Sequence, residues 1–556
     1  MKEATMRKQR SKRPTSSQRR TASIKIKHSP KHANQELPSN FLINSPTSMS
    51  LADQFAILQR LDKMWSTYEY PPEHTDQEAP APQCPSIHDR QAWPEYWQKL
   101  GQPARTEPEI DQKRQQYLAK RLAIAPDIEQ GIYPFKDIKL TRADIEWLLA
   151  THEDEQGPVD WNDLAQRKRQ GLDLRGANLR GLNLSGLPLA CSVLADVHLE
   201  GAILIMAQLQ GAQLSGAHLE GANLLRAQLE EANLSGAYLM RAFLIQADLT
   251  RANLLLAHLD EAQLVGALLE EAQFGLAFLG EAQLMEAHLE RAFLKQAHLE
   301  GAFLNDAHLE GAILARAFLV GADLSNAHLQ GADFSGAHLE GADIENVTLC
   351  NKKHGAPRLA DVRWENINVT VVPWSQMKIL GDEQKAREKK HDGKVKDRDT
   401  RLEEYEVAVR ANRQLTVVLQ TQGLNEDAAR FAYRAQKLQR SVLWYQKKFG
   451  QYLFSLFLSL TSGYGYRLWR SFATYLFVIV GFATAYYLLG TTIKLPLSPL
   501  EAIVFSVTSF HGRGFSPGEN IGLSNPLTIL AAIEAFVGLI IEVTFIATLT
   551  QRFFGK

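Results

Sequence analysis

Cysteine is scarce in this chain, with three residues among 556, at Cys84, Cys191 and Cys350. They lie far apart in the sequence and form no C-x-x-C pair, which argues against a disulfide framework and against a cysteine-based zinc site. The same scarcity indicates a mostly reducing compartment.

Motifs of catalysis and cofactor binding are also lacking. The chain has no Gly-rich phosphate loop, no nucleophile elbow, no paired catalytic carboxylates and no H-E-x-x-H metalloprotease motif. We therefore expect no enzymatic activity, no cofactor and no resident metal ion.

The N-terminus lacks the apolar run of a signal peptide. Residues 1–50 carry eleven Lys and Arg against two acids, which predicts a disordered basic arm. A nucleic-acid-binding arm and contact with anionic lipid are the alternatives. Residues 51–170 follow with helical spacing, Thr141 as a helix N-cap and several tryptophans, and they predict a small, mainly helical cap domain.

Residues 171–350 contain a repeat of five. From Ala202 to Ala342 every fifth residue is alanine, 29 in succession, and leucine follows two positions later except at Phe274, Phe334 and Ile344. A helix would spread these leucines around its surface, and a flat strand would place alternate ones on opposite faces. Only a chain that turns a corner every five residues keeps all of them inside.

The stretch "AHLEGANLLRAQLEEANLSGAYL" resembles the pentapeptide-repeat family, A-(D/N)-L-x-x. The resemblance implies a right-handed quadrilateral β-helix with four pentapeptides to a coil, about nine coils at ~4.8 Å spacing. Some members of this family resemble DNA and inhibit topoisomerases. The membrane segments that follow argue against a nucleic-acid partner for this chain.

Eight of the residues just before the repeat leucines are histidine. His288, His308 and His328 are 20 residues apart, so we expect them to stack on one face of the coil. Such a ladder can hold a metal ion or sense pH. The alternative, which we favour at this point, is that histidine is one of several side chains tolerated at a surface position.

A connector at residues 351–400 leads to two helical patterns at 401–450, separated by Gly423. They predict a helical hairpin similar to one tetratricopeptide unit, which packs on the repeat, on a sister subunit or on the membrane pore. Residues 451–471 predict an interfacial segment that contains "TSGYGY".

Two apolar runs, residues 472–489 and 527–549, are long enough to cross a bilayer. Basic residues lie at the outer flanks of the pair (Lys447, Lys448, Arg467 and Arg470 before it, Arg552 and Lys556 after it). The positive-inside rule places both termini in the cytoplasm and predicts a multi-pass protein of the cell membrane.

The 37 residues between the two spans include "LEAIVFSVTSFHGRGFSPGENIG", from Leu500 to Gly522. A short apolar helix and a Gly-containing loop between two spans resemble the two-transmembrane potassium-channel pore domain, here residues 472–556. The resemblance implies an all-α pore with a re-entrant pore helix and four copies around one axis. "TSGYGY" precedes the first span and cannot form the filter.

The loop departs from the potassium filter. The resemblance implies a selectivity loop at Thr508, Ser509, Phe510, His511, Gly512, Arg513, Gly514 and Phe515. Arg513 replaces the filter tyrosine and Phe510 its threonine, so potassium selectivity does not carry over. Arg513 either braces the loop or lines an anion-permeable or weakly selective pore.

Glu534 and Glu542 lie inside the second span, where an ionised carboxylate costs about 2.5–3.5 kcal/mol unless it is paired or wet. We expect Glu534 to pair with Arg513 at the depth of the loop, and Glu542 to face an inner cavity. Gly538 between them is the expected inner-helix hinge, again by resemblance.

These features predict a multidomain membrane protein. The favoured hypothesis is a homotetrameric ion channel whose cytoplasmic β-helix regulates or assembles the pore, with inorganic ions, lipid and an unknown cytoplasmic regulator as partners. The alternatives are a non-conducting membrane-anchored scaffold and an anion-permeable pore lined by Arg513.

Overall fold

The computed structural model describes residues 92–99, 105–152, 157–391, 394–493, 497–512 and 525–553. For Leu468, Thr548 and residues 551–553 within these ranges, only the backbone is described. The predicted basic arm of residues 1–50 and the first part of the predicted cap lie outside them.

Three helices precede the repeat: α2 (Ala92–Lys99), α3 (Gln112–Leu122) and α4 (Arg142–Ala150), followed by the 3-10 turn η1 (Gln166–Lys168). Helix α4 begins at a capping box, in which the Thr141 hydroxyl and the Asp144 carboxylate accept from each other's backbone N–H groups. Arg142 donates to the carbonyl oxygens of Asn183 (2.9 Å) and Ser185 (3.1 Å). Helix α4 therefore lies against the first coils of the repeat.

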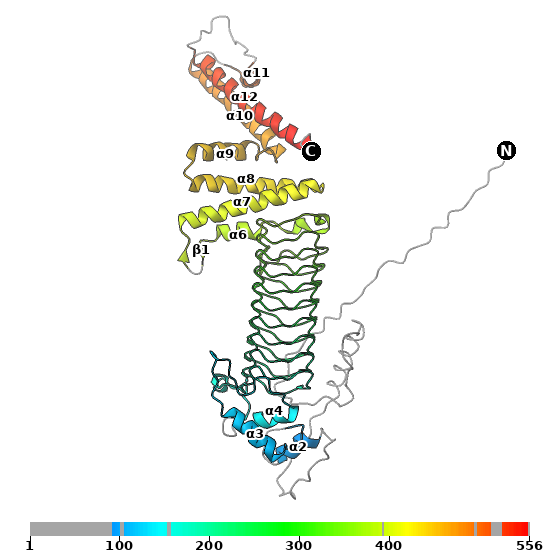
Figure 1. The fold of residues 1–556 in the computed structure, drawn as a ribbon. Coiled ribbons are helices and arrows are strands. Elements are labelled where there is room, and N and C mark those ends of the chain that lie inside the picture. The colour runs from blue at the N-terminus through cyan, green and yellow to red at the C-terminus, as the bar shows by residue number, and fades with distance from the viewer. Residues whose placement is uncertain are drawn as a thin grey trace, which may run out of the picture. The chain divides into compact units, whose positions relative to one another are not determined.

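The repeat forms a stack of coils with a period of 20 residues (Figure 1). Single parallel β-bridges join each side of one coil to the next, as in Asn178↔His198 and His198↔His218. Repeat alanines and leucines point inward, and Ala252 and Leu254 have no exposed surface. The β-helix expected from the five-residue spacing is confirmed.

The stack continues past the predicted boundary at residue 350. The bridges Asp333↔Arg358 and His338↔Arg363 span 25 residues instead of 20, so five extra residues loop out after Cys350. The turns η2 (Val369–Val371) and η3 (Trp374–Gln376) follow.

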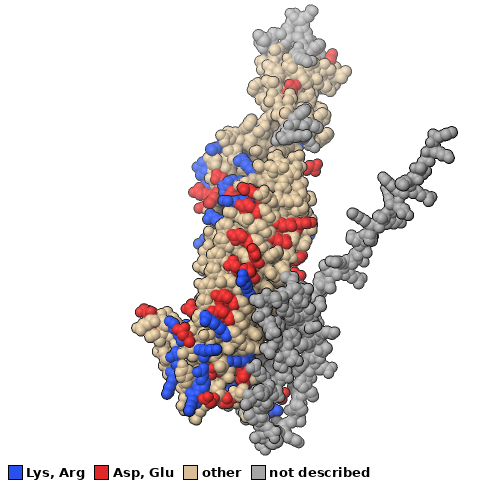
Figure 2. Space-filling model, turned by 45° about the vertical axis from the view of Figure 1, so that its right-hand side comes forward, with Lys and Arg blue, Asp and Glu red and all other residues tan. Residues whose placement is uncertain are grey.

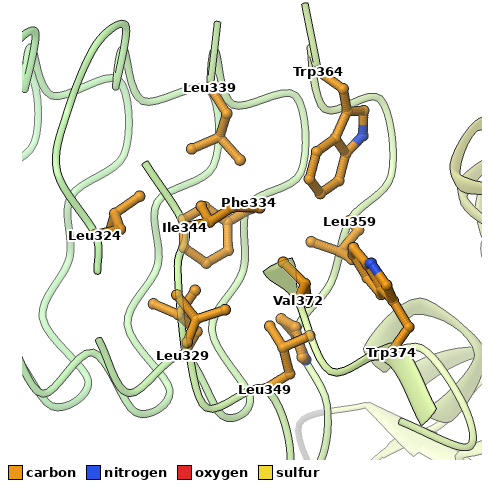
Figure 3. Close-up of a pocket in the computed structure, with 12 residues that line it drawn as sticks. Leu324, Leu329, Phe334, Leu339, Ile344, Leu349, Leu359, Trp364, Val372 and Trp374 are labelled. Atoms are coloured by element: carbon orange, nitrogen blue, oxygen red, sulfur yellow. The ribbon is translucent and has the colours of Figure 1, made fainter. Parts of the chain in front are cut away.

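Apolar side chains close this end of the coil, with Trp364 and Trp374 lying over Phe334 and Leu349 (Figure 3). They enclose a cavity of about 20 Å³. Because its apolar lining offers a water molecule no hydrogen bond, we interpret the cavity as a packing gap and not as a ligand site.

The hairpin packs on that end. It comprises α6 (Gly381–Arg387), the short strands β1 (Lys390–His391) and β2 (Lys394–Val395), α7 (Arg398–Thr421) and α8 (Asn425–Tyr445). Leu415 of α7 and Phe431 of α8 belong to the same apolar core as Trp374. Arg434 donates to the carbonyl of Lys378 (2.6 Å) and pairs with Glu383 (3.3 Å). Among the three packing partners that the sequence left open, the structure shows the repeat.

Four apolar helices end the chain: α9 (Phe449–Thr461), α10 (Leu468–Thr492), α11 (Pro499–Phe510) and α12 (Pro526–Phe553). Trp469–Thr492 and Pro526–Ala547 are long and apolar enough to cross a membrane. Helices α9 and α11 are too short to do so.

Candidate functional site

Helix α11 is a short apolar helix that packs against both candidate spans. Its start is well defined, because Ser498 and Glu501 form a capping box and Pro499 occupies the first turn. Its twelve residues extend about 18 Å, roughly half of a bilayer, before the chain turns at His511 and Gly512.

The end of α11 meets α12 at Gly538. A Cβ atom added to this glycine would collide with the carbonyl oxygen of Phe510 and would lie 3.0 Å from the carbonyl carbon. Only glycine admits this approach between the two backbones. The Phe510 ring is buried and packs edge-on against Tyr475 of α10, with 4.8 Å between ring centroids. The structure therefore gives Gly538 a packing role, and the hinge remains a prediction.

Glu534 is fully buried at the centre of the three helices. Tyr486 of α10 donates its hydroxyl to one carboxylate oxygen (2.6 Å), and Ser506 of α11 lies 2.5 Å from the other. The Ser506 hydroxyl also lies 2.9 Å from the carbonyl oxygen of Ile479. The cost of burying Glu534 is therefore offset in part by hydroxyls from both neighbouring helices.

Glu542 lies beside the turn that ends α11. Its carboxylate is 3.4 Å from Nε2 of His511, and the hydroxyl of Tyr475 is 2.8 Å from the same nitrogen. Nδ1 of His511 lies 2.8 Å from the Val507 carbonyl, which can only accept, so this nitrogen carries a proton. In neutral His511, Nε2 then accepts from Tyr475, and protonation converts Nε2 into a donor toward Glu542.

The predicted selectivity loop is described only in its first part. Thr508 donates to the Val504 carbonyl (3.0 Å) within α11, and Ser509 is buried. Arg513, Gly514 and Phe515 lie outside the described residues, so the pairing of Arg513 with Glu534 remains a prediction.

Sequence reasoning missed three polar side chains of this site, namely Tyr475, Tyr486 and Ser506. All three lie on apolar helices, where hydroxyl groups also occur without any special role. The burial cost of Glu534 signalled that partners were needed, but it did not identify them.

The sequence "TSGYGY" forms the turn between α9 and α10. Gly463, Tyr464 and Gly465 all have positive φ angles, of 55°, 57° and 83°. Tyr464 hydrogen-bonds Ser455 of α9 (2.8 Å) and packs near Tyr433 of α8, 6.1 Å away between ring centroids. This stretch therefore joins the hairpin to the apolar helices, as a connection and not as a filter.

Residues 192–351 match the family model of pentapeptide repeats in a series of overlapping copies, from 192–224 to 317–351. The chain is a pentapeptide-repeat protein. Apart from that repeat domain, the comparisons match no family to the C-terminal helices. A search of curated protein sequences finds no match.

Solved pentapeptide-repeat proteins are similar to this chain over the repeat. One is HetL, involved in heterocyst differentiation regulation in the cyanobacterium Nostoc sp. strain PCC 7120, with 28% identity over 40% of this chain and 96% of HetL, and a TM-score of 0.23. Another is QnrB1, a plasmid-mediated fluoroquinolone resistance protein, with 17% identity over 36% of this chain and 94% of QnrB1, and a TM-score of 0.17. A third, from the Arabidopsis thaliana thylakoid lumen, has 30% identity over 19% of this chain and 67% of that protein, and a TM-score of 0.11.

Proposed function

We propose that this chain is one subunit of a homotetrameric, ion-channel-like membrane protein whose cytoplasmic pentapeptide-repeat domain regulates or assembles the pore. The observation that carries the proposal is the packing of α11. This helix is too short to span a bilayer, yet it packs between two helices that are long enough, and Gly538 is the residue that admits it.

A tetramer follows from the same geometry. The chain turns back within the thickness of a bilayer at residues 511–512, and non-helical backbone at that depth must be buried in protein or line a water-filled cavity. One subunit offers little protein to cover it, whereas four subunits around an axis enclose it. Native mass measurement in detergent should give a tetramer, and a stable monomer or dimer contradicts the proposal.

Currents decide whether the assembly conducts. Purified protein in planar bilayers under a KCl gradient should show unitary currents, and the reversal potential reports the sign of the permeant ion. In our proposal Glu542 favours cations. A reversal potential on the anion side supports the alternative of a pore lined by Arg513 instead.

A non-conducting scaffold is the second candidate, and one observation favours it. Glu534 and Glu542 both have partners within the chain, so neither requires a passing ion to offset its charge. A tetramer that gives no current under any gradient, at densities confirmed by protein reconstitution, supports the scaffold.

Both termini are cytoplasmic in this proposal, since the Lys and Arg residues flank the pair of spans. In sealed cells, an impermeant maleimide should label a cysteine introduced as Glu519→Cys and should leave Cys350 unmodified. The reverse labelling pattern contradicts this orientation.

A further inference from the structure

Three histidines stack on one side of the β-helix. His288, His308 and His328 occupy the same position in successive coils and are joined by parallel β-bridges. Their ring centroids are 4.7 Å and 4.8 Å apart. About a third of each side chain is exposed, so the rings are accessible to solutes.

Two glutamates two positions further along the chain complete this column. The Glu290 carboxylate lies 3.3 Å from Nδ1 of His288. Glu310 lies between two rings, 3.8 Å from Nδ1 of His308 and 3.6 Å from Nδ1 of His328. In each of two groups, His288–Glu290–His308 and His308–Glu310–His328, the three candidate ligand atoms lie within 4.8 Å of one another.

The two carboxylates keep ligand capacity. One oxygen of Glu290 and one of Glu310 are buried without a hydrogen-bond partner in the described part of the chain. In the similar group His198–Glu200–His218, Arg180 donates to both oxygens of Glu200, at 3.0 Å and 2.8 Å. The charge of Glu200 is therefore already balanced by arginine.

We propose that His288, Glu290, His308, Glu310 and His328 bind one divalent transition-metal ion of the zinc class. Imidazole and carboxylate together are ligands that suit zinc, and three protein ligands leave one position for water. For tetrahedral zinc at ~2.1 Å from each ligand, the ligand atoms must approach to about 3.4 Å, which tilting of the partly exposed rings provides. The surrounding surface of the coils is mainly acidic, which attracts cations (Figure 2).

The stoichiometry follows from His308, which belongs to both groups. An ion bound by either group uses this histidine, so each chain holds one ion and not two. The bound ion joins two adjacent coils, and it should therefore stabilise the β-helix against unfolding. The site does not depend on whether the membrane helices form a pore.

Isothermal titration of the full chain in detergent with Zn²⁺ at pH 7.5, together with Co²⁺ absorption, tests the proposal. We expect one tight site per chain. His308→Gln removes a ligand from both groups and should weaken binding by more than about 100-fold. His288→Gln and His328→Gln each leave one group intact and should weaken binding only about twofold, as expected for two alternative sites.

A matched control is available at His298. Its Nδ1 lies 3.1 Å from Glu300, but its ring stacks on Phe278 and Phe318, so no second histidine is within reach. His298→Gln should leave zinc binding unchanged. Circular dichroism and melting without metal check that each variant is folded, and Glu290→Gln with Glu310→Gln provides a second disruption should His308→Gln fail to fold.

Two results overturn the proposal. One is unchanged zinc affinity in folded His308→Gln, or in the folded double glutamate variant. The other is equal loss in His298→Gln and His308→Gln, which would show nonspecific binding to surface histidines.

Discussion

Replacing Gly538 by alanine tests the contact on which the proposed re-entrant packing rests. The new methyl group would occupy the space of the Phe510 carbonyl group, 3.0 Å from its carbon and 3.1 Å from the first ring carbon of the side chain. Backbone atoms cannot rotate away as a flexible side chain can. The end of α11 must therefore move from α12 by more than about 1 Å to restore ordinary contact.

The expected cost is the difference of two effects. Overpacking of this kind destabilises by about 1–3 kcal/mol, and a clash with backbone belongs at the upper end of that range. Alanine gains roughly 1 kcal/mol over glycine within a helix. We therefore expect Gly538→Ala to destabilise the helical domain by about 2 kcal/mol.

Gly481 of α10 provides the control. A Cβ atom added there meets nothing within 4 Å, so Gly481→Ala keeps the helix gain without the clash. It should stabilise by up to about 1 kcal/mol, so the two alanine variants should shift stability in opposite directions. Both can be measured by denaturation of the purified protein in mixed micelles. Equal shifts of the same sign would show that α11 and α12 do not approach as described.

Two further predictions concern the cytoplasmic part. Leu259 is fully buried in the β-helix, so Leu259→Asp places an unpaired carboxylate in an apolar core and should abolish the β-type circular dichroism, whereas Leu259→Ile should preserve it. Unchanged melting of Leu259→Asp would contradict this. Burial raises the pKa of Asp382 to about 6, so its contribution to stability is complete below the unfolded pKa near 4 and is lost as the pH rises through 6. Asp382→Asn retains an acceptor for the Leu359 N–H and should remove this pH dependence, with a gain of up to about 3 kcal/mol at pH 7.5. Parallel stability curves for both proteins between pH 4 and 7.5 would refute the assignment.

The β-helix was predictable because one side-chain spacing has one steric solution. Alanine and leucine alternate at steps of two and three residues, and the structure buries both at every corner, as at Ala302 and Leu304. The end of the stack was not predictable in the same way. The five-residue insertion after Cys350 shifts the phase, and Leu359 and Trp364 continue the core without the alanine that marks earlier coils.

The candidate site was predictable in its charges and not in its contacts. A carboxylate within an apolar run indicates a cost whatever the fold, so Glu534 was identifiable at once. Its partners lie 28 and 48 residues away in the sequence, at Ser506 and Tyr486. Only the packing of α11 between the spans brings these hydroxyls together, and that packing depends on the absence of a side chain at Gly538.

The remaining question is whether Glu534 also pairs with Arg513. Two hydroxyls engage one lone pair on each carboxylate oxygen, which leaves acceptor capacity for a guanidinium. Glu534→Gln is the sharper probe, because its amide can still accept from Tyr486 and donate to Ser506, so only the charge is lost.

If the ion pair forms, Arg513→Ala leaves a buried charge unpaired and should destabilise the tetramer strongly, whereas Arg513→Ala combined with Glu534→Gln should recover part of that loss. The coupling energy from the four proteins of this cycle should then be about 0.5–3 kcal/mol, measured as tetramer stability in detergent. Additive effects would mean that the hydroxyls alone satisfy Glu534. Arg513 would then be available to the axis, where its substitution by alanine should shift the reversal potential toward cations.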